Sequence, residues 1–221
     1  MIAHALVKAK IARSLQVLDW LGQRYDIDPE VRVTRKEAGK LGDATAVPKL
    51  RTVERRVALR YWEAFRKALP DWLDFQGRMT ATDQNNASDP FNAALNYGYG
   101  FLEAECRMAI NAVGLEPAID FLHDSSDYQT KESLVYDLQE PFRWLVDLCV
   151  IHAFESGALE LHDFYLCAHH SRHTHKSTTA NAERRIQNVL AYARSYSPAG
   201  VRGRLNLSVS VSLILCSLKC R

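Results

Sequence analysis

Apolar residues recur at helical spacing through most of the chain. Over residues 3–24 they lie near helical spacing, which predicts an amphipathic helix; these residues are Ala5, Ile11, Leu15, Leu18 and Leu21. The pair Asp28-Pro29 predicts a turn. A weaker helix follows over residues 33–41 and a longer one over residues 49–69, with residues 42–48 as the connecting loop.

The polar stretch over residues 70–89 lacks any periodicity and predicts a long loop. Ser88 or Asp89 can cap the next helix, which we expect over residues 90–114 with Gly114 as its stop. Gly98 and Gly100 lie inside that helix and cost about 1 kcal/mol each relative to alanine. Their presence predicts close packing of the helix against another backbone.

A further helix is expected to reach about residue 156, with Pro141 near its start or at a kink. The character of the chain then changes, because residues 167–221 contain four histidines, a single acid and neither Phe nor Trp. The last stretch, residues 205–221, alternates like a strand. The pattern predicts a mainly α protein and assigns no fold to this tail.

Composition narrows the class of protein. With 221 residues, 47% of them hydrophobic and 24% charged, the chain is typical of a globular protein. It contains no apolar run long enough for a spanning helix, and its start lacks a secretory signal, so we expect a cytoplasmic protein that makes no contact with a membrane. Five cysteines without a CxxC pair argue against disulfides or a zinc site, and we expect Cys106 and Cys149 to be buried.

The net charge of +2 hides a strong segregation of charge. Residues 1–80 carry 16 basic against 10 acidic side chains, residues 81–166 carry 3 against 15, and residues 167–221 carry 9 against 1. This pattern favours a basic lobe that holds a polyanion beside an acidic lobe that holds cations. Two solvated faces are the alternative that composition alone leaves open.

Candidate chemistry lies in the acidic lobe. Asp137 and Glu140 stand three residues apart in an apolar stretch, on one face if that segment is helical. Glu105 on the preceding helix and His123 in the link between the helices could join them. Carboxylates with one imidazole suit Mg²⁺ or Mn²⁺ better than zinc. Surface carboxylates and a core histidine are the alternative, and Glu103 competes with Glu105.

Two segments together resemble a known family. "NAALNYGYGFLEAECRMAINAVGLEPAIDFLH" followed by "SLVYDLQEPFRWLVD" is similar to the CRISPR-associated endonuclease and integrase, protein one of the spacer-adaptation machinery. The upstream segments "HALVKAKIARSLQVL", "VERRVALRYWEAF" and "FQGR" resemble the same family. The resemblance spans residues 3–166, so we expect a helical metal-dependent nuclease domain there, with a basic lobe over 1–80 and an acidic catalytic lobe over 81–166.

The resemblance implies a site and a reaction. The family's metal ligands carry over onto Glu105, His123 and Glu140, with Asp137 as the neighbouring catalytic acid. The implied reaction is attack of a DNA 3′-hydroxyl on a phosphodiester of the repeat array, with Mg²⁺ or Mn²⁺ as cofactor. Implied partners are spacer DNA, the repeat array and a second CRISPR-associated adaptation protein.

The basic residues of the first lobe would hold DNA phosphates and give a salt-dependent affinity. Near the metal, Arg78 and Arg143 are the candidates for phosphate contacts. Ordinary ion pairs with nearby acids are the alternative for both arginines.

The sequence also departs from the family. The chain starts about where the family's helical domain starts, so we expect it to lack the N-terminal β-rich domain through which two copies pair, which puts a homodimer in doubt. Beyond "DFYL", residues 167–221 differ from the family pattern. We therefore expect a truncated copy whose reading frame is disrupted from about Cys167. The alternatives are a casposon-type transposon integrase and a non-catalytic remnant.

Overall fold

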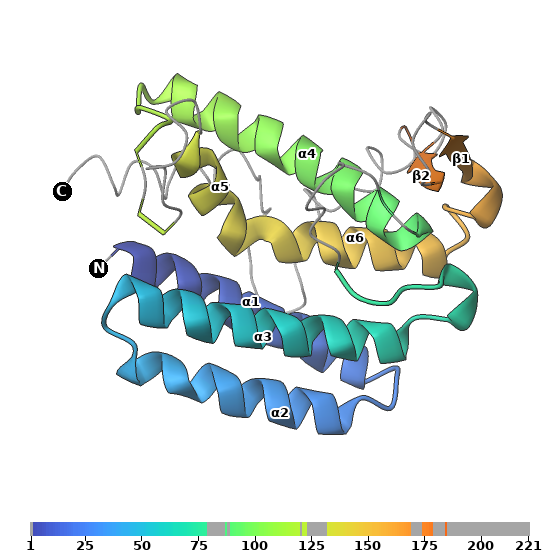
Figure 1. Cartoon of the computed structure of the whole chain (residues 1–221), viewed down its shortest axis with the longest axis horizontal. Helices are drawn as coiled ribbons and strands as arrows, with labels where there is room; N and C mark the ends of the chain where they lie inside the picture. The colour runs from blue at the N-terminus through green and yellow to red at the C-terminus, as the bar shows by residue number, and fades with distance from the viewer. Residues whose placement is uncertain are drawn as a thin grey trace, which may run out of the picture.

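Two layers of helices make up the computed structural model, which describes residues 2–78, 87, 89–119, 121–122, 132–168, 174–178 and 184. One layer holds α1 (Ile2–Gly22), α2 (Asp28–Ala38) and α3 (Val47–Ala68), at the bottom of Figure 1. The other holds α4 (Pro90–Ala112), α5 (Ser133–Gln139) and α6 (Arg143–Glu155), with α6 next to the first layer. The prediction of a mainly α fold is confirmed.

In the first layer the long helices match the apolar periodicity to within about two residues at each end. The prediction of a turn at Asp28-Pro29 is wrong, because these residues begin α2. Proline fits the first turn of a helix, where no intrahelical bond needs its missing N–H. A 3₁₀ turn, η1 (Gly39–Asp43), follows α2 within this layer, and a second one, η2 (Asp71–Leu73), follows α3.

In the second layer α4 begins as predicted, and the choice of cap is settled. The Asp89 side chain accepts the backbone N–H of Asn92 at 2.7 Å, so Asp89 is the N-cap. Gly98 faces α6, where an added Cβ would lie 2.5 Å from Val146 Cγ1. The predicted close approach is therefore present at Gly98, although it meets a side chain and not a backbone. At Gly100 an added Cβ would meet nothing within 4 Å.

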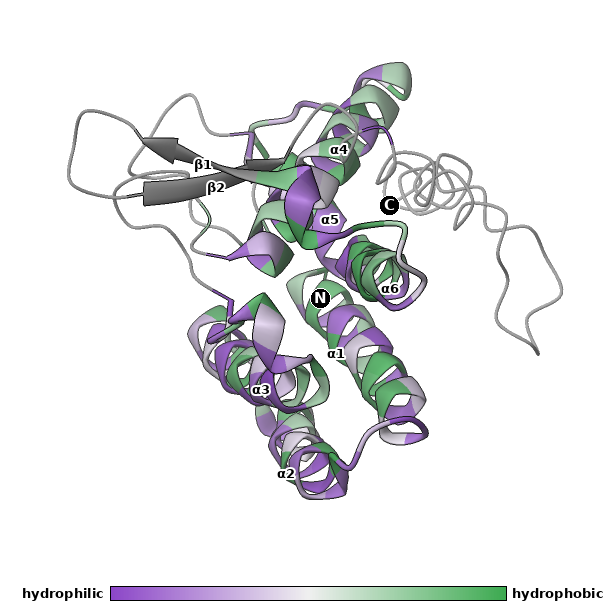
Figure 2. Ribbon diagram, turned by 90° about the vertical axis from the view of Figure 1, so that its right-hand side faces the viewer, coloured by the Kyte–Doolittle hydropathy of each residue, from purple (hydrophilic) through white to green (hydrophobic). Residues whose placement is uncertain are grey.

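Pro141 divides the last predicted helix into separate elements. α5 ends at Gln139, a 3₁₀ turn η3 (Glu140–Phe142) follows, and α6 starts at Arg143. Proline has no N–H for the helical ladder, and a tighter turn accommodates it. The break places Glu140 at the bend between two buried helices. In Figure 2 the ribbon of α6 is largely apolar, consistent with its position between α4 and the first layer.

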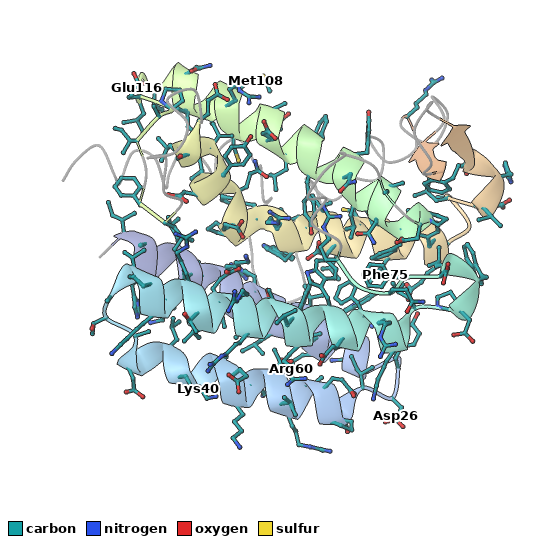
Figure 3. The ribbon with its side chains drawn as sticks, in the orientation of Figure 1. Asp26, Lys40, Arg60, Phe75, Met108 and Glu116 are labelled. Carbon is teal, nitrogen blue, oxygen red and sulfur yellow. The ribbon has the colours of Figure 1, made fainter. Side chains whose placement is uncertain are left out.

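One continuous hydrophobic core joins the two layers. Phe65 of α3, Phe75, Phe91 of α4 and Phe154 of α6 all belong to it. Figure 3 shows Phe75 between the layers, where its ring lies 5.0 Å from that of Phe91. A second, smaller cluster packs the start of α1 against that of α3. The basic and acidic lobes therefore share one hydrophobic core.

Beyond α6 comes a 3₁₀ turn, η4 (Leu161–Asp163), and then a two-stranded antiparallel sheet that the sequence pattern did not predict. Its strands are β1 (Phe164–Ala168) and β2 (Thr174–Thr178), with Phe164 opposite Thr178. The strand-like stretch over residues 205–221 lies outside the described residues. In the part of the chain that the structure describes, no helix is both long and apolar enough to cross a membrane.

Candidate functional site

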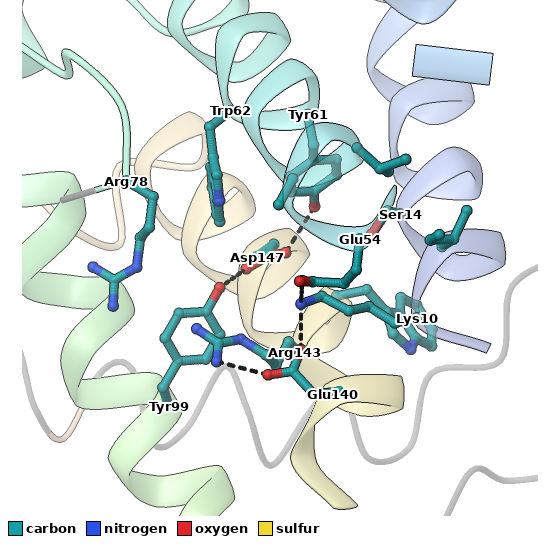
Figure 4. A pocket seen from close by; sticks show the side chains of 14 residues that line it. Lys10, Ser14, Glu54, Tyr61, Trp62, Arg78, Tyr99, Glu140, Arg143 and Asp147 are labelled. Atoms are coloured by element: carbon teal, nitrogen blue, oxygen red, sulfur yellow. Dashed lines mark hydrogen bonds and ion pairs between the residues drawn. The ribbon is translucent and has the colours of Figure 1, made fainter. Parts of the chain in front are cut away.

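A pocket of about 220 Å³ opens between the two helical layers, and Glu140 lies in its wall. The Glu140 residue is only 6% exposed. Its carboxylate lies 2.5 Å from the Lys10 ammonium of α1 and 3.3 Å from Arg143 Nη1 (Figure 4). Two cations thus balance the charge of a carboxylate that burial alone would make costly.

Lys10 connects the two layers at this point. Its ammonium also pairs with Glu54 of α3, so one cation contacts two carboxylates (Figure 4). Burial lowers the pKa of Lys10, but Glu140 and Glu54 raise it more, so its pKa lies above the usual value. Lys10 is therefore positively charged at neutral pH.

Asp137 has a different environment, because it does not line this pocket. The residue is fully buried, and its Oδ2 accepts the backbone N–H groups of Phe121 at 2.8 Å and Leu122 at 2.9 Å. These two residues immediately precede His123 in the chain. His123 itself lies outside the described residues.

On α4 the structure separates the two competing glutamates. Glu103 accepts a hydrogen bond from Arg107 at 2.7 Å, and Arg107 also pairs with Glu132. Glu103 is thus part of an ion-pair network with Arg107 and Glu132. Glu105 is half-buried, as Glu103 is, and it does not line the pocket. Cys106 and Cys149 are buried as predicted.

Two of the three predicted metal ligands, Glu105 and Glu140, lie in the described part of the chain. Within the described ranges, no three His, Cys, Asp or Glu side chains gather in a way that could hold a metal ion. The third predicted ligand, His123, lies outside those ranges. The chemistry of the donor set still suits a hard cation, because Glu105 and Glu140 offer carboxylate oxygens.

The two candidate arginines differ in their partners. Arg143 packs its guanidinium 4.0 Å from the centre of the Tyr99 ring while it pairs with Glu140. Arg78 donates to the side-chain oxygens of Asn92 at 2.8 Å and Asn96 at 2.6 Å. Both partners of Arg78 are neutral, and burial lowers its pKa. Arg78 therefore presents an oriented positive charge to the pocket.

Asp147 is a site residue that sequence reasoning missed. It is 3% exposed in α6 and accepts hydrogen bonds from the hydroxyls of Tyr61, at 2.7 Å, and Tyr99 (Figure 4). Burial raises the pKa of Asp147, although both hydroxyls and Arg143 oppose that shift. Its position four residues after Arg143 places both on one helix face and was the available signal.

The chain matches a family model described as CRISPR associated protein Cas1 over residues 1–184. It is 34% identical over 159 residues to "CRISPR-associated endonuclease Cas1 1" of Archaeoglobus fulgidus, a match that covers 64% of this chain and 46% of that protein. It is 35% identical over 162 residues to "CRISPR-associated endonuclease Cas1" of Methanopyrus kandleri, covering 71% and 47%. The chain thus spans about half the length of these curated relatives.

Solved structures share the fold. A casposase bound to integration product superimposes with a TM-score of 0.83 at 36% identity, covering 98% of this chain and 58% of that one. A chain of a Cas6-RT-Cas1–Cas2 complex gives a TM-score of 0.81 at 22% identity, covering 99% of this chain and 23% of that one. The helical layers described above are therefore an arrangement found in experimentally solved proteins.

Proposed function

The chain belongs to the CRISPR-associated Cas1 family, as its resemblance predicted, and from this premise we propose that it is a divalent-metal-dependent DNA endonuclease and integrase of spacer acquisition. The observation that carries this proposal is the family match over residues 1–184. A buried carboxylate, Glu140, in a pocket between a basic and an acidic lobe supports it. In the proposed reaction a DNA 3′-hydroxyl attacks a phosphodiester of the repeat array.

Glu105, His123 and Glu140 would hold Mg²⁺ or Mn²⁺ in this proposal. When bound, the ion would neutralise charge on the phosphodiester and favour ionisation of the attacking hydroxyl. Glu140 would have to exchange its contact with Lys10 for the ion or share it. Asp137 acts through the backbone, because its carboxylate fixes the two residues that precede His123.

The first lobe would hold the DNA. Its outer helices, α2 and α3, carry exposed basic side chains that form no ion pair with any described residue; these are Arg32, Lys36, Lys49, Arg51, Arg55, Arg56 and Arg66. Such charges bind phosphates without regard to sequence and give affinity that falls with salt. Arg78 would extend this surface to the pocket. A second CRISPR-associated adaptation protein and a second copy of this chain are further proposed partners.

Strand transfer on a branched DNA, with and without Mn²⁺, tests the proposal. Metal-dependent joining should be lost in Glu105→Ala and His123→Ala. Glu103→Ala is the matched control on the same helix, two residues away, and should retain joining because Glu103 belongs to the ion-pair network with Arg107. Equal loss in all three variants would contradict the assignment of Glu105. A folded wild type that joins no DNA would favour a non-catalytic remnant.

A casposon-type integrase is the second candidate, favoured by the casposase structure at 36% identity. The two candidates share the joining chemistry and differ in the DNA that they recognise. Competition between a repeat-array target and transposon-end DNA in the same joining assay separates them. Preference for transposon ends would replace the first proposal with the second.

A further inference from the structure

One buried carboxylate in the wall of the pocket connects three helices. Asp147 of α6 receives the Tyr61 hydroxyl from α3 on one oxygen and the Tyr99 hydroxyl from α4 on the other. All three residues are less than 10% exposed, with Asp147 at 3%. Nothing in the proposed reaction uses Asp147 directly, so a carboxylate this deeply buried in the pocket wall calls for another explanation.

The Tyr99 ring provides the link between this carboxylate and the candidate ligand. Arg143 lies over the ring at 4.0 Å from its centre and reaches Glu140 with Nη1. Burial lowers the pKa of Arg143, but Glu140, Tyr99 and Asp147 together raise it further than burial lowers it. The guanidinium thus lies over the Tyr99 ring and pairs with Glu140, while the Tyr99 hydroxyl bonds to Asp147 (Figure 4).

A planar guanidinium held by both a ring face and a carboxylate has little freedom to turn. The hydroxyl of Tyr99 fixes the ring, because a buried donor without its acceptor would be costly. If the ring shifts, Arg143 shifts with it, and the Glu140 carboxylate loses one of its two cationic partners. The remaining partner, Lys10, comes from the other layer.

We propose that Asp147 and Tyr99 are positioning residues that hold Arg143, and through it the Glu140 carboxylate, in the orientation needed to bind a divalent cation. The inference rests on the proposed function, since Glu140 is a metal ligand only there. In this proposal Arg143 orients Glu140, and Arg78 is the arginine that contacts a DNA phosphate. Supporting groups one step removed from a metal ligand typically change metal affinity or activity 10- to 100-fold when removed.

Mn²⁺ affinity, measured by calorimetry or electron paramagnetic resonance on the full chain, tests this inference. We expect Asp147→Asn and Tyr99→Phe to weaken Mn²⁺ binding by about tenfold or more. In strand transfer they should lower kcat with little change in KM for DNA. Tyr25→Phe is the matched control, because it removes a tyrosine hydroxyl bonded to Glu155 at 2.7 Å, away from the pocket. It should leave Mn²⁺ affinity unchanged.

A second control and a double-mutant cycle test whether weaker Mn²⁺ binding results from loss of stability alone. Val150→Ala empties core space on the same helix and should lower Tm while Mn²⁺ affinity stays at the wild-type value. In an Arg143→Gln background, Tyr99→Phe should have no further effect on Mn²⁺ affinity, because the two residues act in series. Independent effects of the two substitutions would overturn the inference.

Failure of the inference and failure of the proposed function give different results. If the wild-type chain binds Mn²⁺ and joins DNA while Asp147→Asn and Tyr99→Phe match it in affinity, the inference alone is wrong. If the wild-type chain binds no Mn²⁺, the proposed function is wrong and the inference falls with it.

Discussion

Substitution of Gly98 tests how closely the two helices that flank the candidate site are packed. A Cβ at this position would lie 2.5 Å from Val146 Cγ1, whereas ordinary van der Waals contact begins at 3.4 Å. In Gly98→Ala, α4 and α6 must therefore separate or Val146 must change its rotamer. Overpacking of this kind costs about 1–3 kcal/mol.

Gly100→Ala is the matched control for this substitution. Both glycines lie inside α4, and both substitutions gain about 1 kcal/mol of helix propensity. An added Cβ at Gly100 meets nothing within 4 Å, so its variant should be more stable than wild type. The difference in unfolding free energy between the two variants isolates the overpacking cost, and we expect about 1–3 kcal/mol in favour of Gly100→Ala.

Urea unfolding followed by far-UV circular dichroism measures both variants. A third variant, Gly98→Ala with Val146→Ala, removes the Cγ atoms that the new methyl group would meet. The cost of the two substitutions together should be smaller than the sum of their separate costs. If Gly98→Ala is as stable as Gly100→Ala, the reasoning from the close approach of α4 and α6 is refuted.

Three further predictions concern the charges of the site. Lys10→Met removes a cation from Glu140 and should destabilise the chain by about 3 kcal/mol. Addition of Mn²⁺ should raise the Tm of this variant by more than it raises the Tm of wild type. Equal Tm shifts would show that Lys10 does not affect metal binding. Arg78→Gln should lower the slope of log affinity for DNA against log salt by about 1, with Arg143→Gln as the control that leaves the slope unchanged. Asp137→Ala leaves the buried N–H of Leu122 and the partly buried N–H of Phe121 without this acceptor and should cost about 1–3 kcal/mol, measured by urea unfolding; a near-neutral result would show that residues 121 and 122 do not depend on Asp137.

The long helices could be predicted from sequence because their signal is local. The periodicity of α1 and α3 and the proline at the start of α4 are visible within a single turn or two. The failures are also informative. Asp28-Pro29 was interpreted as a turn because the same dipeptide suits a turn and a helix start. At Pro141, whether a helix kinks or divides depends on the neighbours that pack against it.

Part of the candidate site was predictable, because Glu140, Arg78 and Arg143 all line the pocket. Asp137 and Glu140 stand out because two carboxylates in an apolar stretch need compensation. The local partner of Glu140, Arg143, agrees with the ion-pair alternative. The distant partners were not predictable, because Lys10 lies in the first helix of the chain and the N–H groups on Asp137 come from residues 121 and 122. Asp147 escaped notice for the same reason, since Tyr61 is 86 residues away in sequence.

The segregation of charge along the chain now has two explanations that act together. Some of these charges are neutralised within the molecule, because Lys10 of the basic lobe pairs with Glu140 of the acidic lobe. Tyr61 reaches Asp147 across the same boundary, and Arg13 lies 5.4 Å from the ring centre of Trp144. These contacts exist only when the two layers are docked, so the pocket depends on the continuous core that joins the layers. The exposed basic side chains of α2 and α3 take no part in these contacts. In the proposed function, this remaining positive charge would attract the DNA.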